Sequence, residues 1–417
     1  MPPLLRQQKK QPSIAKIMVG IVAVCALAYG GYRGVTWMFA SGGVIEAVQT
    51  AKPTTLDTAR ALLEEGKSNE AREALRPIAA DAKDAQVAVP AIMMLAELDA
   101  KAGDRAKAIE GFKRISTEFP QSSERPRAMA LYAKLLEEDG KTQEAIAVYN
   151  EIRTNAPAEF RAPALTGIAR QAERDGKTSE ARDLYAEALK GATWDSPEWN
   201  EALDAVGRAN IAMVFSQGET PESKIYTIEK GDSFTSIGIK LNTTLGLLTR
   251  ANGLTPESKL NLGQRLKWTP KDFRIVIERS KCRLFLLDAN GIFKRYNCGL
   301  GKPGHETTLG LYKIGNKEKD PVWHKPGEGP IPAGDPRNLL GTRWMPMVPV
   351  QEGLPKDLGI HGAPDPTTVG SFTSNGCARM KMEEVEELYD LVVRSTPVQV
   401  VEVVDPATLS SLAIVQA

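Results

Sequence analysis

The C-terminal part of the chain is organised around one short sequence, Ser374-Asn375-Gly376-Cys377-Ala378-Arg379-Met380, with His361-Gly362 before it and the histidine 16 positions before the cysteine. A thiolate is the reactive form of cysteine, and the pKa of a free thiol is about 8.5. A histidine that accepts the thiol proton removes this handicap at neutral pH. A lone cysteine is otherwise a small buried apolar residue. The joint spacing favours a nucleophile and a base.

Gly376 and the turn around it have two expected uses. Gly376 allows a positive φ or a close backbone approach that a side chain would block. The backbone N–H groups of such a tight turn suit the stabilisation of a developing oxyanion. The sequence therefore predicts a turn built for attack on a carbonyl carbon.

The whole pattern resembles the L,D-transpeptidase (YkuD-type) family, whose signature is His-Gly followed by Ser/Thr-x-Gly-Cys-x-Arg/Asn. The resemblance implies that Cys377 is the acyl-accepting nucleophile and that His361 is its base. It also implies that the carbonyl of Gly362 orients the imidazole. Gly376 and Cys377 would then supply the oxyanion N–H groups.

The resemblance further implies a substrate pocket around the cysteine. Ser374 and Arg379 match positions that shape the pocket and hold the turn, and Trp344 lies in a segment similar to the strand that lines the family's cleft. Asn375 departs from the second histidine that many relatives have, and Ala378 departs from their bulkier aliphatic residue. No cofactor and no metal are expected for this chemistry.

Composition narrows the class of protein. The chain has 417 residues, which suggests roughly three domains. Lys plus Arg is 53 and Asp plus Glu is 52, so net charge does not favour a nucleic-acid partner. Four cysteines without a Cys-x-x-Cys pair, and three scattered histidines, make a protein-built zinc site unexpected.

The N-terminus predicts export. Residues 1–16 are basic, and residues 17–39 form an apolar segment interrupted by Arg33 that is long enough for a transmembrane signal-anchor. The positive-inside rule places residues 1–16 in the cytoplasm and the rest in the periplasm or cell envelope. A cleaved signal peptide is the alternative. Residues 40–53 read as a linker.

Residues 54–217 predict helical repeats. Glycines recur at positions 66, 103, 140 and 176, with an alanine five positions after each and a bulky residue nine positions after each. Small residues let paired helices approach, and large ones fill the layer between repeats. The segment resembles tetratricopeptide repeats. We expect either a docking surface for a protein partner or a spacer from the membrane.

Residues 224–270 predict a small βααβ module. A Gly231-Asp232 turn follows the first strand, Asn252-Gly253 closes the second helix, and Gly263-Gln264 begins the returning strand. The module resembles a LysM domain, which implies binding to the glycan of peptidoglycan through the loops after Gly231 and around 252–254. A spacer without glycan affinity is the alternative.

Residues 272–405 predict a mainly β catalytic domain, with an uninformative tail at 406–417. A hairpin around 288–291 places Cys282 opposite Cys298, as a disulfide or as two reduced neighbours. The Pro- and Gly-rich segment 321–336 reads as a lid over the cleft. We expect His305 and His324 to be solvated. The alternative for His324 is a contact with the substrate.

The predicted architecture is therefore a membrane anchor, an all-α solenoid, a LysM domain and a mainly β catalytic domain. The implied function is a peptidoglycan L,D-transpeptidase that joins the diamino acids of two stem peptides through a cysteinyl thioester. Three alternatives stay open: hydrolysis as an L,D-carboxypeptidase, attachment of a protein or an amino acid to peptidoglycan, and a non-catalytic wall-binding scaffold.

Overall fold

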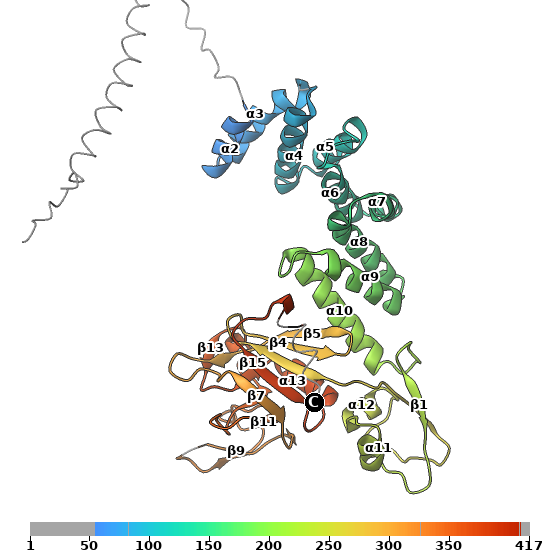
Figure 1. Cartoon of the computed structure of the whole chain (residues 1–417), viewed down its shortest axis with the longest axis vertical. Coiled ribbons are helices and arrows are strands. Elements are labelled where there is room, and N and C mark those ends of the chain that lie inside the picture. The colour runs from blue at the N-terminus through green and yellow to red at the C-terminus, as the bar shows by residue number, and fades with distance from the viewer. Residues whose placement is uncertain (1–54, 82, 326, 408, 410–417) are drawn as a thin grey trace, which may run out of the picture.

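The computed structural model describes residues 55–81, 83–325, 327–407 and 409. A helical arm leads into two smaller units, one a long β-sheet and one a small α/β module (Figure 1). The predicted anchor at 17–39 and its flanks lie outside the described residues. Within the described ranges, no helix has both the length and the apolar character needed to span a bilayer.

The arm consists of antiparallel helices that pack on their neighbours in chain order. They are α2 (Leu56–Glu64), α3 (Ser68–Asp81), α4 (Ala85–Lys101), α5 (Arg105–Glu118), α6 (Arg125–Glu138), α7 (Thr142–Asn155), the short η1 (Ala158–Phe160), α8 (Arg161–Arg174), α9 (Thr178–Gly191) and α10 (Pro197–Phe215).

The predicted repeat pattern explains these helices. The four turn glycines have φ between +74° and +83°, a region that only glycine enters without strain. The alanines and the bulky residues of the pattern are all buried, as the examples of Ala108, Phe112 and Tyr149 show. The repeat prediction from spacing is confirmed.

Helix α10 ends the arm and also covers the sheet of the catalytic unit, which the sequence did not predict. Its Trp199 and Leu203 belong to one buried cluster with Val276, Phe285 and Leu287 of the sheet. Figure 1 shows α10 lying between α9 and the β4–β5 hairpin. The repeat region and the catalytic unit therefore share a core.

Charged groups reinforce this junction. Asp195, just before α10, accepts hydrogen bonds from Arg283 at 2.6 Å and from Lys281. These cations hold the pKa of the Asp195 carboxyl well below its usual range. Within α10, Asn210 donates to the carbonyl of Phe293 at 2.8 Å. The arm is thus fixed to the sheet by apolar and polar contacts together.

The small module has the predicted βααβ order. It consists of β1 (Lys224–Thr227), α11 (Phe234–Lys240), α12 (Leu245–Arg250) and β2 (Arg265–Trp268), with β1 antiparallel to β2. Ser233 caps α11 with a capping box, whereas Asp232 accepts from the hydroxyl of Tyr226 at 2.7 Å. The Asn252 side chain donates to the carbonyl of Leu248, which closes α12.

Two sets of contacts hold the module against its neighbours. Lys267 is buried and donates to the carbonyls of Met213 and Ser216 at the end of α10. On the other side, Thr244 and Arg250 bind Asp390 of the catalytic unit, the latter at 3.0 Å. The module therefore has a defined orientation relative to the sheet.

The catalytic unit is built on a nine-stranded sheet with the order β14-β12-β11-β7-β15-β3-β4-β5, and β8 pairs with β11. Its strands are β3 (Arg274–Glu278), β4 (Arg283–Asp288), β5 (Gly291–Asn297), β7 (Gly310–Ile314), β8 (Glu318–Lys319), β11 (Arg343–Pro349), β12 (Gly359–Gly362), β14 (Ala378–Met380) and β15 (Pro397–Val401). Smaller elements are β6 (Leu300–Gly301), which pairs with β13 (Phe372–Ser374), β9 (Trp323–His324), which pairs with β10 (Pro330–Ile331), and η2 (Pro366–Thr368).

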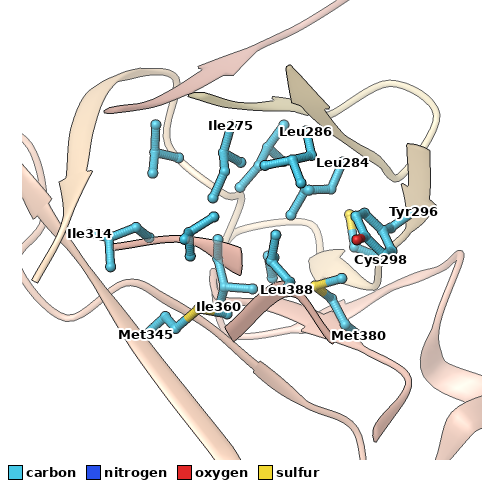
Figure 2. Packing of buried hydrophobic residues seen from close by; sticks show 14 of the residues in the cluster. Ile275, Leu284, Leu286, Tyr296, Cys298, Ile314, Met345, Ile360, Met380 and Leu388 are labelled. Atoms are coloured by element: carbon cyan, nitrogen blue, oxygen red, sulfur yellow. The ribbon is translucent and has the colours of Figure 1, made fainter. Parts of the chain in front are cut away.

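Helix α13 (Met382–Leu391) packs on the sheet and completes the core. Figure 2 shows Ile275, Leu284 and Leu286 gathered above Ile360 and Leu388. Its inward face is fully buried at the centre of the helix, at Val385 and Leu388. The final strand β15 alternates, because Val398 and Val400 are buried and the residues between and beside them are at least partly exposed.

The hairpin register is as predicted for most of its length. Arg283 pairs with Asn297 and Leu286 with Lys294, before a one-residue shift near the turn. Cys298 donates its N–H to the carbonyl of Cys282 at 2.8 Å, so the two cysteines face each other. Both thiols are free and buried. Of the two alternatives, reduced neighbours describe the structure.

Candidate active site

Two parallel strands bring the candidate histidine and cysteine together. His361 lies on β12, and Cys377 immediately precedes β14. In the parallel register His361 pairs with Arg379, two residues beyond the cysteine. Because side chains two residues apart in a strand point to the same face, Cys377 and His361 share one face of this sheet edge. Segments 16 residues apart thus become neighbours.

The imidazole of His361 is held in one orientation. The side chain is 4% exposed, and its Nδ1 lies 2.8 Å from the carbonyl oxygen of Gly362. A carbonyl only accepts, so Nδ1 carries the hydrogen and Nε2 is the basic nitrogen. Burial, with a smaller contribution from the Arg379 charge, lowers the pKa of His361 to about 4, although the carbonyls of Gly362 and Leu339 favour the protonated ring.

Neighbouring residues pack closely around this ring. The Trp344 ring lies 5.9 Å from the imidazole, centroid to centroid. Gly359 provides room for the Trp344 ring, since a Cβ there would lie 2.3 Å from it. A Cβ on Gly362 would lie 2.5 Å from the sulfur of Met382. Both glycines are therefore required by packing.

Cys377 is partly exposed, and its thiol is protonated at neutral pH. The Sγ atom lies 3.7 Å from the carbonyl oxygen of Asp357. Burial, with a smaller contribution from the charge of Asp357, raises the pKa of Cys377 to about 11, although the N–H of Gly359 and the charge of Arg379 oppose the rise. Among the described residues there is no hydrogen bond between this thiol and His361. The resting site therefore holds a neutral thiol beside a neutral imidazole.

The turn before β14 is held by Ser374. Gly376 has φ +116°, which confirms the expected need for glycine. Its N–H donates to Ser374 Oγ at 3.1 Å, and the same oxygen donates to the carbonyl of Cys377 at 2.7 Å. The expected oxyanion role of Gly376 needs correction, because its N–H is already engaged. The N–H of Cys377 has no partner in the described part of the chain.

The other predicted pocket residues differ in their access to a ligand. Ser374 is only 1% exposed, so it holds the turn and does not face a substrate, contrary to its assignment as a substrate-binding residue. Asn375 is exposed at the turn. Arg379 is half-buried, and its Nε is buried without a hydrogen-bond partner in the described residues. Arg379 also bridges to Gly299 through two backbone hydrogen bonds.

The two remaining histidines lie on loops. His305 is exposed, and its carbonyl lies 3.7 Å from the position that a Cβ on Gly376 would take. His324 is exposed on β9, whose pairing with β10 gives the predicted lid segment a short hairpin. Both are solvated as expected. No group of three or more histidine, cysteine or acidic side chains suited to a metal occurs within the described ranges.

Sequence reasoning missed the segment that faces the cysteine, residues 357–359. Asp357 contacts the thiol, Leu358 packs where a Cβ on Gly376 would lie, and Gly359 offers its N–H to the sulfur. The sequence did offer one signal for this segment. Gly359 lies two positions before His361, and residues two apart in a strand face the same side of the sheet. The side chain of Asp357 gave no such signal.

This arrangement suits acyl transfer. A thiol next to a fixed, neutral imidazole can lose its proton as it attacks a carbonyl carbon. The free N–H of Cys377 lies at the same turn, where the oxyanion of the tetrahedral intermediate would develop. The backbone carbonyls around His361 stabilise the imidazolium that forms.

Comparison with known proteins agrees with this chemistry. Residues 272–400 match the L,D-transpeptidase catalytic domain, residues 226–269 match the LysM domain, and residues 90–122 match a tetratricopeptide repeat. YqjB of Bacillus subtilis, which is assigned to the L,D-transpeptidases, is 29% identical over 134 residues, covering 32% of this chain and 73% of the relative.

Two further matches extend the comparison. YkuD of Bacillus licheniformis, assigned to the same enzymes, is 25% identical over 182 residues, covering 42% of this chain and 98% of the relative. The crystal structure of an L,D-transpeptidase from Mycobacterium tuberculosis aligns with a TM-score of 0.27 and 16% identity, over 34% of this chain and 75% of that chain.

Proposed function

Because residues 272–400 form an L,D-transpeptidase catalytic domain, we propose that this enzyme cross-links the diamino acids of two peptidoglycan stem peptides through a thioester on Cys377. The observation that carries the proposal is the pairing of β12 with β14. It places the thiol and an imidazole oriented by Gly362 on one face of the sheet edge.

The first half-reaction transfers the donor acyl group to the enzyme. Sγ of Cys377 attacks the carbonyl carbon of the donor diamino acid, and Nε2 of His361 takes the thiol proton. The N–H of Cys377 stabilises the oxyanion. The C–N bond to the terminal D-alanine then breaks, and the leaving amine receives the proton from His361. Because the resting thiol is neutral, proton transfer accompanies the attack.

The second half-reaction resolves the thioester. An amine of a second stem attacks the thioester carbonyl, His361 takes a proton from that amine, and the thiol leaves with a proton. Asn375 and Arg379 flank the turn, and Trp344 lies beside the imidazole, so these three residues are the proposed substrate contacts. No cofactor enters either step.

The remaining parts of the chain support a location of this chemistry at the cell wall. The LysM domain at 226–269 supports binding to wall glycan, which raises the local concentration of stems. We assign residues 17–39 to a single membrane span, with the catalytic unit in the periplasm or cell envelope. The repeats would carry a protein partner on their surface.

Product analysis tests the proposal. The full chain is incubated with a purified disaccharide-tetrapeptide, and products are identified by mass spectrometry. A cross-linked dimer that disappears with Cys377→Ser supports the transpeptidase. A tripeptide alone, with no dimer even when a second amine is supplied, would replace it with an L,D-carboxypeptidase. A new adduct only with an added amino acid or protein would reassign the acceptor.

Unchanged substrate would favour the wall-binding scaffold. The matched control is His324→Gln, an exposed histidine on β9. Its turnover should stay within about twofold of the wild type, whereas His361→Gln should lose at least about a hundredfold, the scale of a lost general base.

A further inference from the structure

A groove of about 810 Å³ separates the LysM domain from the catalytic domain. One wall comes from the LysM domain and includes Phe234, Ile239 and Leu245. The other wall comes from the catalytic domain and includes Lys319, Arg343 and Arg394. None of the residues that line the groove belongs to the turn of Cys377.

The catalytic wall carries a surplus of positive charge. Lys319 and Arg394 are exposed, and neither pairs with a carboxylate among the described residues. Arg343 is 13% exposed, with carboxylates of Glu386 at 3.7 Å and Asp320 at 4.0 Å. Asp390 is the acidic lining residue, and it is already paired with Arg250. Lys317 also lines the groove, but it donates to the carbonyls of Tyr389 and Val392. Two exposed cations are therefore left for an anionic ligand.

The LysM wall is apolar. Ile239 is 78% exposed and Leu245 is 42% exposed, although both are large aliphatic residues. A sugar ring has apolar C–H faces as well as hydroxyl groups, so it fits such a surface. The threonine and asparagine side chains of the same wall, Asn242 and Thr243, offer hydrogen-bonding groups, and the hydroxyl of Thr243 is buried without a partner in the described structure.

The groove is continuous with the glycan face expected for the LysM domain. Thr235, near the Gly231 loop, and Pro256, just after the 252–254 loop, both line its LysM end. The contacts of Thr244 and Arg250 with Asp390 hold the two walls in place. The groove is therefore formed before a ligand arrives.

We propose that this groove binds the carboxylate-bearing part of a wall glycan strand whose neighbouring sugars lie on the LysM loops, so that one strand contacts both domains. The cations match the anionic groups, and the apolar wall matches the sugar rings. This combination favours carboxylated glycan over a phosphodiester polymer, which shares only the negative charge. The inference rests on the proposed wall-modifying function.

Binding to purified cell-wall sacculi tests the proposal. The full chain carrying Lys319→Gln and Arg394→Gln is compared with the wild type by co-sedimentation with sacculi from which phosphate polymers have been removed. We expect an affinity loss of about tenfold, the scale of two exposed charge contacts. The loss should vanish when the carboxyl groups of the sacculi are amidated.

Two further variants keep the test decisive. Ile239→Ser alters the opposite wall at an exposed position, and we expect it to weaken binding as well. Lys113→Gln with Lys313→Gln removes the same charge from exposed sites on α5 and β7 and should bind as the wild type does.

Each other outcome overturns the proposal. If the groove variant binds as tightly as the wild type, or if the control variant loses as much affinity as the groove variant, then the groove does not contribute to wall recognition. A loss seen only with sacculi that retain phosphate polymers would reassign the ligand to phosphodiesters. Binding does not require acyl transfer. If the wild type binds sacculi but forms no acyl-enzyme, the proposed function is wrong, whereas the proposed role of the groove is still supported.

Discussion

Replacing Leu203 of α10 by alanine should destabilise the catalytic domain, although Leu203 lies in the helical arm. The side chain is fully buried in the cluster that joins α10 to the sheet residues Val276, Phe285 and Leu287. The substitution removes three carbon atoms, worth about 0.8 kcal/mol each. The cavity left behind raises the expected cost to about 3 kcal/mol.

Thiol labelling of Cys282 and Cys298 measures this cost inside the catalytic domain. Both thiols are buried, so a reagent reaches them only when the domain opens. A loss of about 3 kcal/mol corresponds to about a hundredfold increase in the open population, at 1.4 kcal/mol per tenfold. The labelling rate in mild urea, followed by peptide mapping, should rise by that factor.

Leu136→Ala is the matched control, because Leu136 is equally buried but lies in a cluster made only of repeat residues. It should leave the labelling of Cys282 and Cys298 unchanged. If Leu203→Ala also leaves the labelling rate unchanged, then α10 does not share a core with the sheet.

Three other predictions concern the turn and the domain boundary. Alkylation of Cys377 should accelerate about tenfold per pH unit up to about pH 11, because the pKa of its thiol is raised to about 11 and the thiolate fraction rises with pH. A plateau in the alkylation rate between pH 7 and 9 would indicate a preformed thiolate. Ser374→Ala should lower kcat/KM by about tenfold or more, because it removes two buried hydrogen bonds worth about 1 kcal/mol each, whereas Ser374→Thr should keep most activity in the same assay. A fragment that begins at Lys224 should be less soluble and melt lower than one that begins at Asp195, since only the longer one keeps α10; equal melting temperatures would argue against the shared core.

The sequence predicted the features that depend on local patterns. The repeats follow from glycines, alanines and bulky residues at fixed spacing, and these residues occupy turns and buried layers as expected. The hairpin register followed from its Asp-Ala-Asn-Gly turn, which placed Cys282 opposite Cys298. Turn chemistry and periodicity act over a few residues, so one sequence is enough to recognise them.

The missed features depend on contacts between distant segments. The cover that α10 gives to the sheet joins residues about 80 positions apart, as the bond from Asn210 to Phe293 shows. The engagement of the Gly376 N–H by Ser374 depends on the geometry of one turn, and the motif alone allowed both N–H groups to face an oxyanion. The contact of Asp357 with Cys377 arises only once β12 lies beside β14.

The central claim is that Cys377 takes the acyl group and His361 takes its proton. Intact-protein mass spectrometry after mixing the full chain with a carbapenem tests it most directly, followed by peptide mapping of the adduct. We predict one adduct on Cys377, none with Cys377→Ser, and adduct formation at least about a hundredfold slower with His361→Gln. An unmodified mass for the wild type, or an adduct on Cys282 or Cys298, would contradict the account.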